Sequence, residues 1–348
     1  MLQKTSLFYL IILVTVSLLS SIAIADTVFS PRMNQIQVIG THNSYHKRPK
    51  YISWAKNVTK AVQDWDYEHL PLDVQLENGV RSLEIDIHNT PEGWKVMHAP
   101  YFDNETTCAT LQECLKVVQE WSDKNPWHVP IIIMIERKTE GPVLDKRITN
   151  PKKEDIERIE EDILSAIPRD KIITPDLIRG DCKTLEEAVL TKGWPKLEEV
   201  RGKILFIFHN RWELREFYLD GHPNLEGRLM FVNSRPGDPF SATVIIDNPF
   251  HPDIPEWVKK GYLVRVFGGD PKTDDMETVR MKDEKAFSCG AHVISTDNPP
   301  GEVHTGTGYF AIFPEGSTVR WNPINGPINV DIWPEPKNSL NKQQIDTK

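Results

Sequence analysis

Acidic and imidazole side chains stand at the ends of four successive apolar segments of the sequence. These polar groups are His42-Asn43, Glu84-Ile85-Asp86, His98 and Glu136-Arg137-Lys138. Side chains alternate across a strand, so Glu84 and Asp86 share one face of their segment. Glu136 and Lys138 share a face for the same reason. In a sheet of neighbouring parallel strands, all of these side chains gather at one end.

Carboxylates that converge in this way repel one another unless a cation lies between them. Oxygen ligands suit a hard divalent cation, and we expect Ca²⁺, with Mg²⁺ less favoured. The expected metal ligands are Asn43, Glu84, Asp86 and Glu136.

Two histidines, His42 and His98, are the expected catalytic residues. They follow neighbouring segments, where they could exchange protons with a phosphoryl group or stabilise its charge. We interpret His46, His88 and His209 as structural histidines, although His209 ends a further apolar segment and could line the same end.

Eight short apolar or β-branched segments are the expected strands. They cover residues 36–41, 80–87, 94–98, 131–136, 204–208, 229–232, 262–267 and 292–296. Apolar residues recur every three or four positions in 111–121 and 153–167, which predicts helices there. Alternating strands and helices predict an α/β fold with parallel pairing, and eight strands predict a (β/α)8 barrel of the TIM type with some irregularity. Residues 243–246 compete for the sixth strand. An open doubly wound sheet is the alternative, although no G-x-G-x-x-G follows an early strand.

The composition describes a globular chain. Its 348 residues are 39% hydrophobic and 26% charged, which allows a large core and excludes collagen-like, coiled-coil and disordered chains. Lys4, the apolar run 7–19 and Ala23-Ile24-Ala25 predict a signal peptide, residues 1–25, and a secreted protein. An uncleaved membrane anchor is the alternative, but the apolar run is short for a bilayer span. We therefore expect no transmembrane segment in the mature chain.

The mature chain keeps 40 basic and 50 acidic side chains, a net charge of −10, because only Lys4 is lost from the chain's 41 basic residues. Without a basic tract, nucleic acid is not an expected partner. A membrane lipid can still be a substrate. We expect a catalytic barrel over residues 26–312. A C-terminal extension over 313–348 is rich in Pro and Asn and then polar, which indicates partial disorder. The oligomeric state is not predicted.

Four cysteines remain after signal cleavage, and export favours disulfides. Cys108 and Cys114 flank the start of a helix and are close enough in sequence to pair, while a Cys182–Cys289 pair follows only by elimination. A zinc site is the alternative, but C-x-x-C and H-E-x-x-H spacings are absent from the sequence. The sequons at Asn57 and Asn104 would accept glycans in a eukaryotic host.

The run Ile39-Gly40-Thr41-His42-Asn43-Ser44-Tyr45, followed by Glu84-Ile85-Asp86, His98 and Glu136, resembles the phosphatidylinositol-specific phospholipase C superfamily. It is most similar to the secreted Ca²⁺-dependent phosphoinositide phospholipase C branch. Further stretches that resemble this branch are Thr174-Pro175-Asp176, Arg179-Gly180, Gly193-Trp194-Pro195, Arg201-Gly202-Lys203 and Ile294-Ser295-Thr296-Asp297. The order of these motifs over residues 35–300 is more specific than any one of them.

The resemblance implies a phosphoric diester hydrolase that acts on a phospholipid at a membrane surface. The inositol 2-hydroxyl would attack the phosphodiester, releasing diacylglycerol and a cyclic inositol phosphate. It implies that His42 stabilises the reacting phosphorus and that His98 is the acid for the leaving group. It also implies that Asn43, Glu84, Asp86 and Glu136 bind Ca²⁺. The base, Glu84 or Glu136, stays open.

Two basic residues are expected to hold phosphate or inositol oxygens. Lys138 shares a face with Glu136, and Arg265 lies inside the seventh expected strand. For Arg265, an ion pair between strands is the alternative. Val266-Phe267 follows it where the branch favours a second cation, which leaves the headgroup preference open.

Two other functions compete with the phospholipase C interpretation. A metal-dependent glycerophosphodiesterase or a sphingomyelinase-D-like barrel has a similar His, Glu-x-Asp, His arrangement, but glycerophosphodiesterases typically have His-Arg-Gly where this chain has His42-Asn43-Ser44. A catalytically inactive phosphoinositide-binding barrel is the third hypothesis. Binding alone requires no pair of proton-transfer groups, and this disfavours it.

Overall fold

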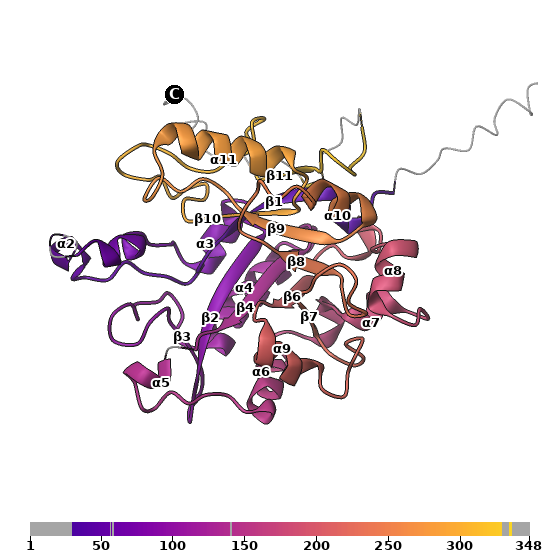
Figure 1. Cartoon of the computed structure of the whole chain (residues 1–348), viewed down its shortest axis with the longest axis horizontal. Coiled ribbons are helices and arrows are strands. Elements are labelled where there is room, and N and C mark those ends of the chain that lie inside the picture. Colours follow the sequence, from indigo (N-terminus) through magenta and orange to yellow (C-terminus); the bar gives the residue numbers. More distant parts are fainter. Residues whose placement is uncertain (1–29, 56, 58, 140, 329–333, 336–348) are drawn as a thin grey trace, which may run out of the picture. The chain divides into compact units, whose positions relative to one another are not determined.

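A computed structural model describes residues 30–55, 57, 59–139, 141–328 and 334–335 of the chain (Figure 1). The expected signal peptide, residues 1–25, lies outside these ranges, and so does the polar end of the C-terminal extension. Within the described ranges, no helix has the length and apolar character needed to cross a membrane.

Parallel strands form a barrel, and the described part of the chain supplies eight of them. They are β1 (Ile36–Thr41), β2 (Ser82–Thr90), β4 (Ile131–Arg137), β6 (Ile204–Phe208), β7 (Met230–Val232), β8 (Thr243–Ile245), β9 (Leu263–Phe267) and β10 (Val293–Thr296). Neighbouring strands follow the order β7-β6-β4-β2-β1-β10-β9-β8. A single parallel bridge between Asn233 and Thr243 joins the two ends. The expected TIM-type barrel is therefore confirmed, with an irregular closure.

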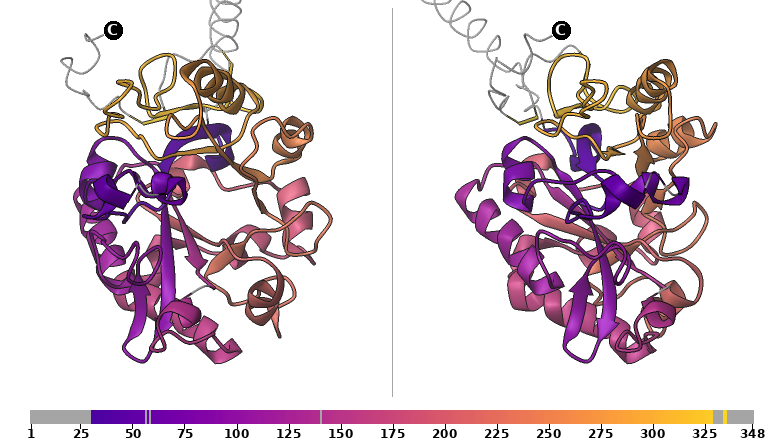
Figure 2. Two further views of the ribbon diagram at one scale, coloured as in Figure 1. Left: turned by 60° about the vertical axis from the view of Figure 1, so that its left-hand side comes forward. Right: turned by 90° about the vertical axis from the view of Figure 1, so that its left-hand side faces the viewer.

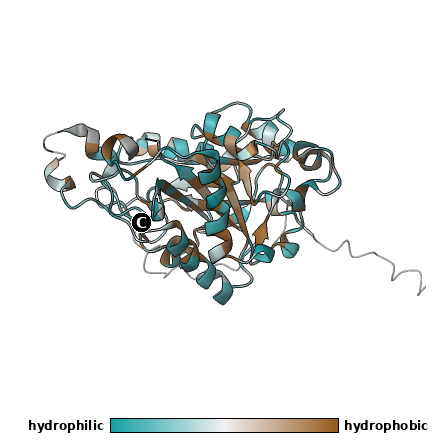
Figure 3. Ribbon diagram, turned by 90° about the horizontal axis from the view of Figure 1, so that it is seen from below, coloured by the Kyte–Doolittle hydropathy of each residue, from teal (hydrophilic) through white to brown (hydrophobic). Residues whose placement is uncertain are grey.

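The strands are apolar because both of their faces are buried. In β4, residues 131–135 are Ile-Ile-Ile-Met-Ile and all are buried, as is typical of parallel strands covered on both sides. Figure 3 shows these hydrophobic strands at the centre and hydrophilic surfaces on the helices around them. Buried carboxylates on these strands, such as Glu84 and Asp86, are therefore exceptional.

The prediction of one of the eight barrel strands is wrong. Residues 94–98 do not join the barrel, because β3 (Gly93–Val96) turns back and pairs antiparallel with the end of β2. The turn depends on Gly93, whose φ of +112° suits glycine. The eighth barrel position is taken by β8, the apolar run that competed for the sixth strand. Alternation of apolar side chains predicts a strand but not its partner or direction, which explains the error.

Helices connect most of the strands. They are α2 (Ile52–Ala55), α3 (Leu72–Glu77), α4 (Leu111–Lys124), α5 (Gly141–Leu144), α6 (Lys153–Ala166), α7 (Pro175–Arg179), α8 (Leu185–Thr191), α9 (Trp212–Leu219), α10 (Ile254–Lys260) and α11 (Met276–Ser288). The expected helices over 111–121 and 153–167 are confirmed as α4 and α6. Thr110 caps α4 by accepting a hydrogen bond from the Glu113 amide. Figure 2 shows the helices outside the strands.

Three short strands are peripheral to the barrel. Besides β3, β5 (Ile172–Ile173) pairs with β6, and β11 (Val319–Trp321) pairs antiparallel with β1. Part of the C-terminal extension therefore adds a strand beside β1, and Phe313 at its start is buried.

The cysteines confirm one expectation and correct another. Cys108 and Cys114 form a disulfide, as predicted. Cys182 and Cys289 are both buried and unbonded, so the pair expected by elimination does not form. Cys182 precedes α8, which leads into β6, whereas Cys289 directly follows α11, which leads into β10. Three strands separate β6 from β10 in the sheet, and a disulfide requires closer approach.

Candidate active site

A cavity of about 710 Å³ opens at the carboxyl ends of the barrel strands. Four of the expected site residues line it together: His42, Glu84, Glu136 and Arg265. A second cavity of about 700 Å³ shares Glu136 and His209 with it and extends toward α9. Active sites of such barrels lie at this end, because each strand delivers its last side chains there.

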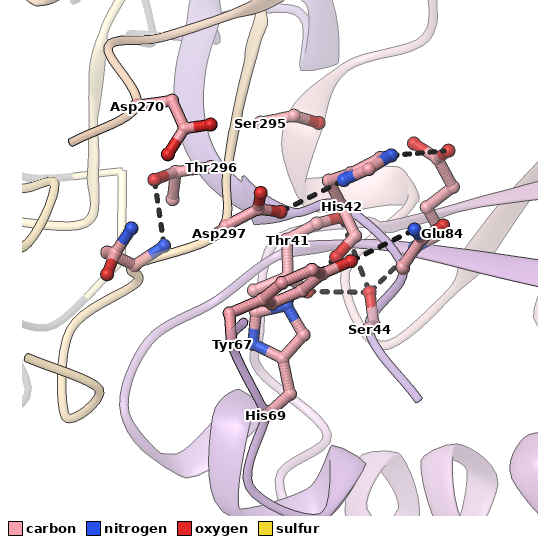
Figure 4. Close-up of polar contacts among 12 residues, drawn as sticks. Thr41, His42, Ser44, Tyr67, His69, Glu84, Asp270, Ser295, Thr296 and Asp297 are labelled. Carbon is pink, nitrogen blue, oxygen red and sulfur yellow. Dashed lines mark hydrogen bonds and ion pairs between the residues drawn. The ribbon is translucent and has the colours of Figure 1, made fainter. Parts of the chain in front are cut away.

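His42 is held between two carboxylates. Its Nδ1 lies 2.9 Å from Asp297 Oδ1, and its Nε2 lies 4.0 Å from Glu84 Oε1 (Figure 4). A carboxylate can only accept, so Nδ1–H donates to Asp297 and Nε2 is directed toward Glu84. Burial lowers the pKa of His42, but the charges of Asp297 and Glu84 outweigh it and leave the pKa above its usual value.

Asp297 also pairs with Lys272. The Lys272 ammonium forms an ion pair with Asp297 Oδ2, and the lysine side chain is almost completely buried. The burial of Asp297 raises its pKa, yet Lys272 and His42 together hold that pKa far below the usual range. The Lys272 ammonium also lies 4.2 Å from the centre of the Tyr67 ring. This carboxylate therefore stays ionised and fixes the orientation of the His42 ring.

Asn43 has a left-handed backbone, with φ of +45°, which asparagine tolerates better than most residues. Its side-chain amide donates to the Tyr67 hydroxyl at 3.0 Å. Its carbonyl oxygen, Oδ1, is buried and has no hydrogen-bond partner among the described residues. The side chain is thus oriented by its nitrogen while its oxygen is left available.

The three expected carboxylate ligands lie on adjacent strands, because Asp86 of β2 is in register with Glu136 of β4. Asp86 Oδ2 accepts from the Tyr45 hydroxyl at 2.7 Å and lies 3.1 Å from the Lys138 ammonium. Glu136 Oε2 lies 3.2 Å from the same ammonium. Burial raises the pKa of Asp86. For Glu136, His209 and Lys138 overcome burial and hold the pKa far below its usual value.

These residues fit a calcium ion. Asp86 Oδ1, like Asn43 Oδ1, is buried without a hydrogen-bond partner in the described ranges, and Ca²⁺ prefers such oxygens. Glu84, Glu136 and His209 each offer one ligand atom, and these atoms lie within 4.8 Å of one another. The unpartnered oxygens and the crowded carboxylates are what a divalent cation would satisfy.

His98 lies in the loop after β3, outside the wall of the 710 Å³ cavity. Its Nδ1 donates to Asp103 Oδ2 at 2.8 Å, and Asp103 Oδ1 lies 2.7 Å from His46 Nε2. Burial raises the pKa of Asp103, but the hydrogen bonds of the two histidines outweigh it and lower the pKa. The ring of His88, two residues after Asp86 on β2, lies 3.3 Å from the His98 carbonyl oxygen. His98 therefore lies beside the end of the strand that carries Asp86.

Both expected substrate-binding residues are engaged with acids. Lys138 bridges Asp86 and Glu136. Arg265 lies 3.1 Å from Glu84 Oε2, pairs with Asp247 and donates to Ser295 Oγ at 3.0 Å. The ion-pair alternative for Arg265 thus describes its contacts here, and contact with a substrate stays a prediction for both residues.

Sequence reasoning missed four residues of this site, Tyr67, Asp103, Lys272 and Asp297, and it favoured a structural role for His209 while noting that this residue could line the same end. Asp297 directly follows β10, so the rule that found Glu136 could have found it. The other three lie in long loops, where residue type and spacing give no signal.

The chain belongs to the family of phosphoinositide phospholipases C, Ca²⁺-dependent, whose model matches residues 31–93 and 90–323. It is therefore a phosphoric diester hydrolase by family. Among curated proteins, none matches the sequence.

Solved structures of two bacterial enzymes are similar in fold. The calcium-dependent phosphoinositol-specific phospholipase C from a Pseudomonas species, apo form, is 17% identical, with a TM-score of 0.57 over 84% of this chain and 95% of that chain. The Ca²⁺-dependent phosphatidylinositol-specific enzyme from Streptomyces antibioticus is 18% identical, with a TM-score of 0.55 over 77% and 95%. At these identities the likeness supports the fold alone.

Proposed function

We propose that the protein is a secreted Ca²⁺-dependent phospholipase C that cleaves phosphatidylinositol-type lipids to diacylglycerol and a cyclic inositol phosphate. The observation that carries this proposal is the wall of the 710 Å³ cavity. There His42, oriented by Asp297, faces the carboxylates Glu84 and Glu136 of a metal-binding set.

The residues of the set have distinct roles in this proposal. Asn43, Glu84, Asp86 and Glu136 would hold Ca²⁺ through their oxygens. When bound, the ion would supply positive charge that acidifies the inositol 2-hydroxyl and offsets phosphate charge. His42 donates a hydrogen bond from Nε2 to a phosphate oxygen, which stabilises the charge that builds up as the phosphorus is attacked. The hydrogen bond from its Nδ1–H to Asp297 persists throughout the reaction.

Proton transfers complete the reaction. The 2-hydroxyl proton passes to a carboxylate of the cluster, Glu84 or Glu136, as the oxygen bonds to phosphorus. The bond from phosphorus to the glycerol oxygen breaks, and that oxygen takes a proton from His98 Nε2. Asp103 accepts a hydrogen bond from the opposite nitrogen of His98, Nδ1, and so fixes the orientation of the ring.

A product analysis tests the reaction. Purified mature protein is mixed with phosphatidylinositol vesicles, with Ca²⁺ or with excess EGTA, and the products are identified by phosphorus NMR. We expect cyclic inositol phosphate with Ca²⁺ and none with EGTA. Parallel incubations with glycerophosphocholine and lysophosphatidylcholine test the rival class. Choline release without cyclic inositol phosphate, or a full rate in EGTA, contradicts the proposal.

The proposal also includes export of the protein and the bounds of its catalytic barrel. Residues 1–25 direct export, residues 26–312 form the catalytic barrel, and 313–348 extend from it. Terminal sequencing of the secreted protein should give Asp26 as the first residue. A protein retained in the membrane with Met1 intact contradicts the export signal.

A further inference from the structure

The Lys138 ammonium occupies the centre of the carboxylate pair. It lies 3.1 Å from Asp86 and 3.2 Å from Glu136, and its side chain is only 16% exposed. Both acids belong to the proposed calcium-binding set. The placement follows from the strands, since Asp86 and Glu136 are in register on β2 and β4 and Lys138 follows β4 directly.

We propose that Lys138 is a built-in counter-cation of the calcium site and competes with Ca²⁺ for the oxygens of Asp86 and Glu136. The inference rests on the proposed function, because it takes these two acids as metal ligands. It assigns Lys138 a role in setting how tightly the metal is held.

Lys138 and Arg265 differ in how firmly they are held. Arg265 is anchored by Glu84, by Asp247 and by the Ser295 hydroxyl, and its side chain is 2% exposed. The Lys138 ammonium has only the two carboxylates as hydrogen-bond or ion-pair partners in the described part of the chain. Its flexible stem also lets the charge move without the backbone. Lys138 is therefore the cation that a metal displaces.

The lysine has opposite effects on the two states of the protein. Without metal, it neutralises Asp86, a fully buried carboxylate whose charge would otherwise be costly. With metal, its positive charge opposes a divalent ion that needs the same oxygens. The structure thus combines a stable metal-free fold with a weakened calcium affinity.

The Lys138→Met variant separates these effects, because Met matches the unbranched stem of Lys to within its terminal ammonium and removes the charge. Calcium affinity is measured by calorimetry and by the calcium concentration that gives half of the shift in Tm, with the full mature protein. We expect a lower Tm without calcium and calcium binding about 10- to 100-fold tighter, the scale of one charge acting on a divalent ion a few ångströms away. Lys282→Met is the control, since Lys282 lines the same cavity but pairs with Asp274 at 2.7 Å.

The outcomes distinguish the two proposals. Equal calcium affinity in the wild type and in Lys138→Met overturns the role of Lys138 and leaves the metal site standing. A tighter site in both lysine variants also overturns it, because the effect would then come from general charge. No response to calcium in any protein overturns the metal site and the competition together.

A measurement on the wild type covers the case in which Lys138→Met does not fold. An amine-reactive ester labels the lysines with and without Ca²⁺, and mass spectrometry gives the rate at each position. Calcium should raise the labelling of Lys138 several-fold and leave Lys272, which pairs with Asp297 and Asp270, unchanged. Calcium binding that leaves Lys138 labelling unchanged contradicts displacement.

Discussion

The two sides of the cavity differ in how their charges are balanced. On the side of β1, β9 and β10, one carboxylate, Asp297, receives both His42 and Lys272. On the side of β2 and β4, Glu84, Asp86 and Glu136 share two permanent cations, and a buried oxygen of Asp86 has no hydrogen-bond partner within the described residues. The carboxylate of the first side is fully paired and orients the His42 ring, whereas the second side has more carboxylates than permanent cations and suits an added cation.

The largest expected effect separates catalysis from metal binding. His42→Ala and His98→Ala should each slow turnover by about 10² to 10⁴, the scale of groups that transfer protons or stabilise charge. Calcium affinity should stay near that of the wild type, because neither ring is a proposed ligand. Steady-state kinetics with phosphatidylinositol vesicles and calcium calorimetry check this. A near-normal rate in either variant removes that residue from the mechanism.

Acid should destabilise the fold at the amino ends of β9 and β10 through His292. Its ring lies 2.8 Å from the Asn34 carbonyl oxygen and accepts from the Val264 amide at 3.0 Å, so the neutral form is the one that is bonded. Burial lowers its pKa to about 4, from 6.5. The unfolded chain takes up the proton first as the pH falls below 6.5, so the stabilising contribution is lost between pH 6.5 and 4. The loss is at most about 3 kcal/mol.

His292→Gln isolates this contribution. Urea unfolding at neutral and at acidic pH should show a smaller loss of unfolding free energy in the variant than in the wild type. His88 and His128, whose pKa values burial also lowers to about 4, keep their own contributions in both proteins. An identical pH dependence in the two proteins contradicts the assignment to His292.

Asp297→Asn should disturb the orientation of the His42 ring without changing calcium affinity. The asparagine has nearly the same shape, but it removes the charge that holds the Nδ1 proton of His42. We expect turnover to fall by about 10- to 100-fold, as for other residues that orient a functional histidine. Calcium calorimetry is the matched readout, and the affinity should not change. A variant that loses calcium affinity as much as turnover would show that the two sides are not separate.

Removal of the disulfide should lower stability without affecting either side of the cavity. Replacing Cys108 and Cys114 by Ser should lower the free energy of unfolding by about 2 kcal/mol, as expected for so short a loop. Urea unfolding measures the loss, and calcium affinity serves as the control. Free thiols at both positions in the wild-type protein, found by mass spectrometry, would contradict the pairing.

The sequence predicted the barrel and the residues at its strand ends, because both depend on local patterns. Apolar runs followed at once by acids or histidines identify strands and their carboxyl ends, as at Glu136. The hairpin of β3 was missed because alternation does not reveal a strand's partner. Asp103 lies only five residues from His98, and Lys272 lies 25 residues from Asp297, but both belong to loops, where spacing does not show which way a side chain points. Contacts of this kind depend on tertiary packing, which spacing does not encode.

A crystal structure of the wild type grown with Ca²⁺ tests the central claim most directly. We predict one ion in the 710 Å³ cavity, about 2.3–2.6 Å from oxygens of Asn43, Glu84, Asp86 and Glu136, with the Lys138 ammonium withdrawn from Asp86. A calcium-loaded crystal with no ion at these four residues, or with the ion held elsewhere, would contradict the account.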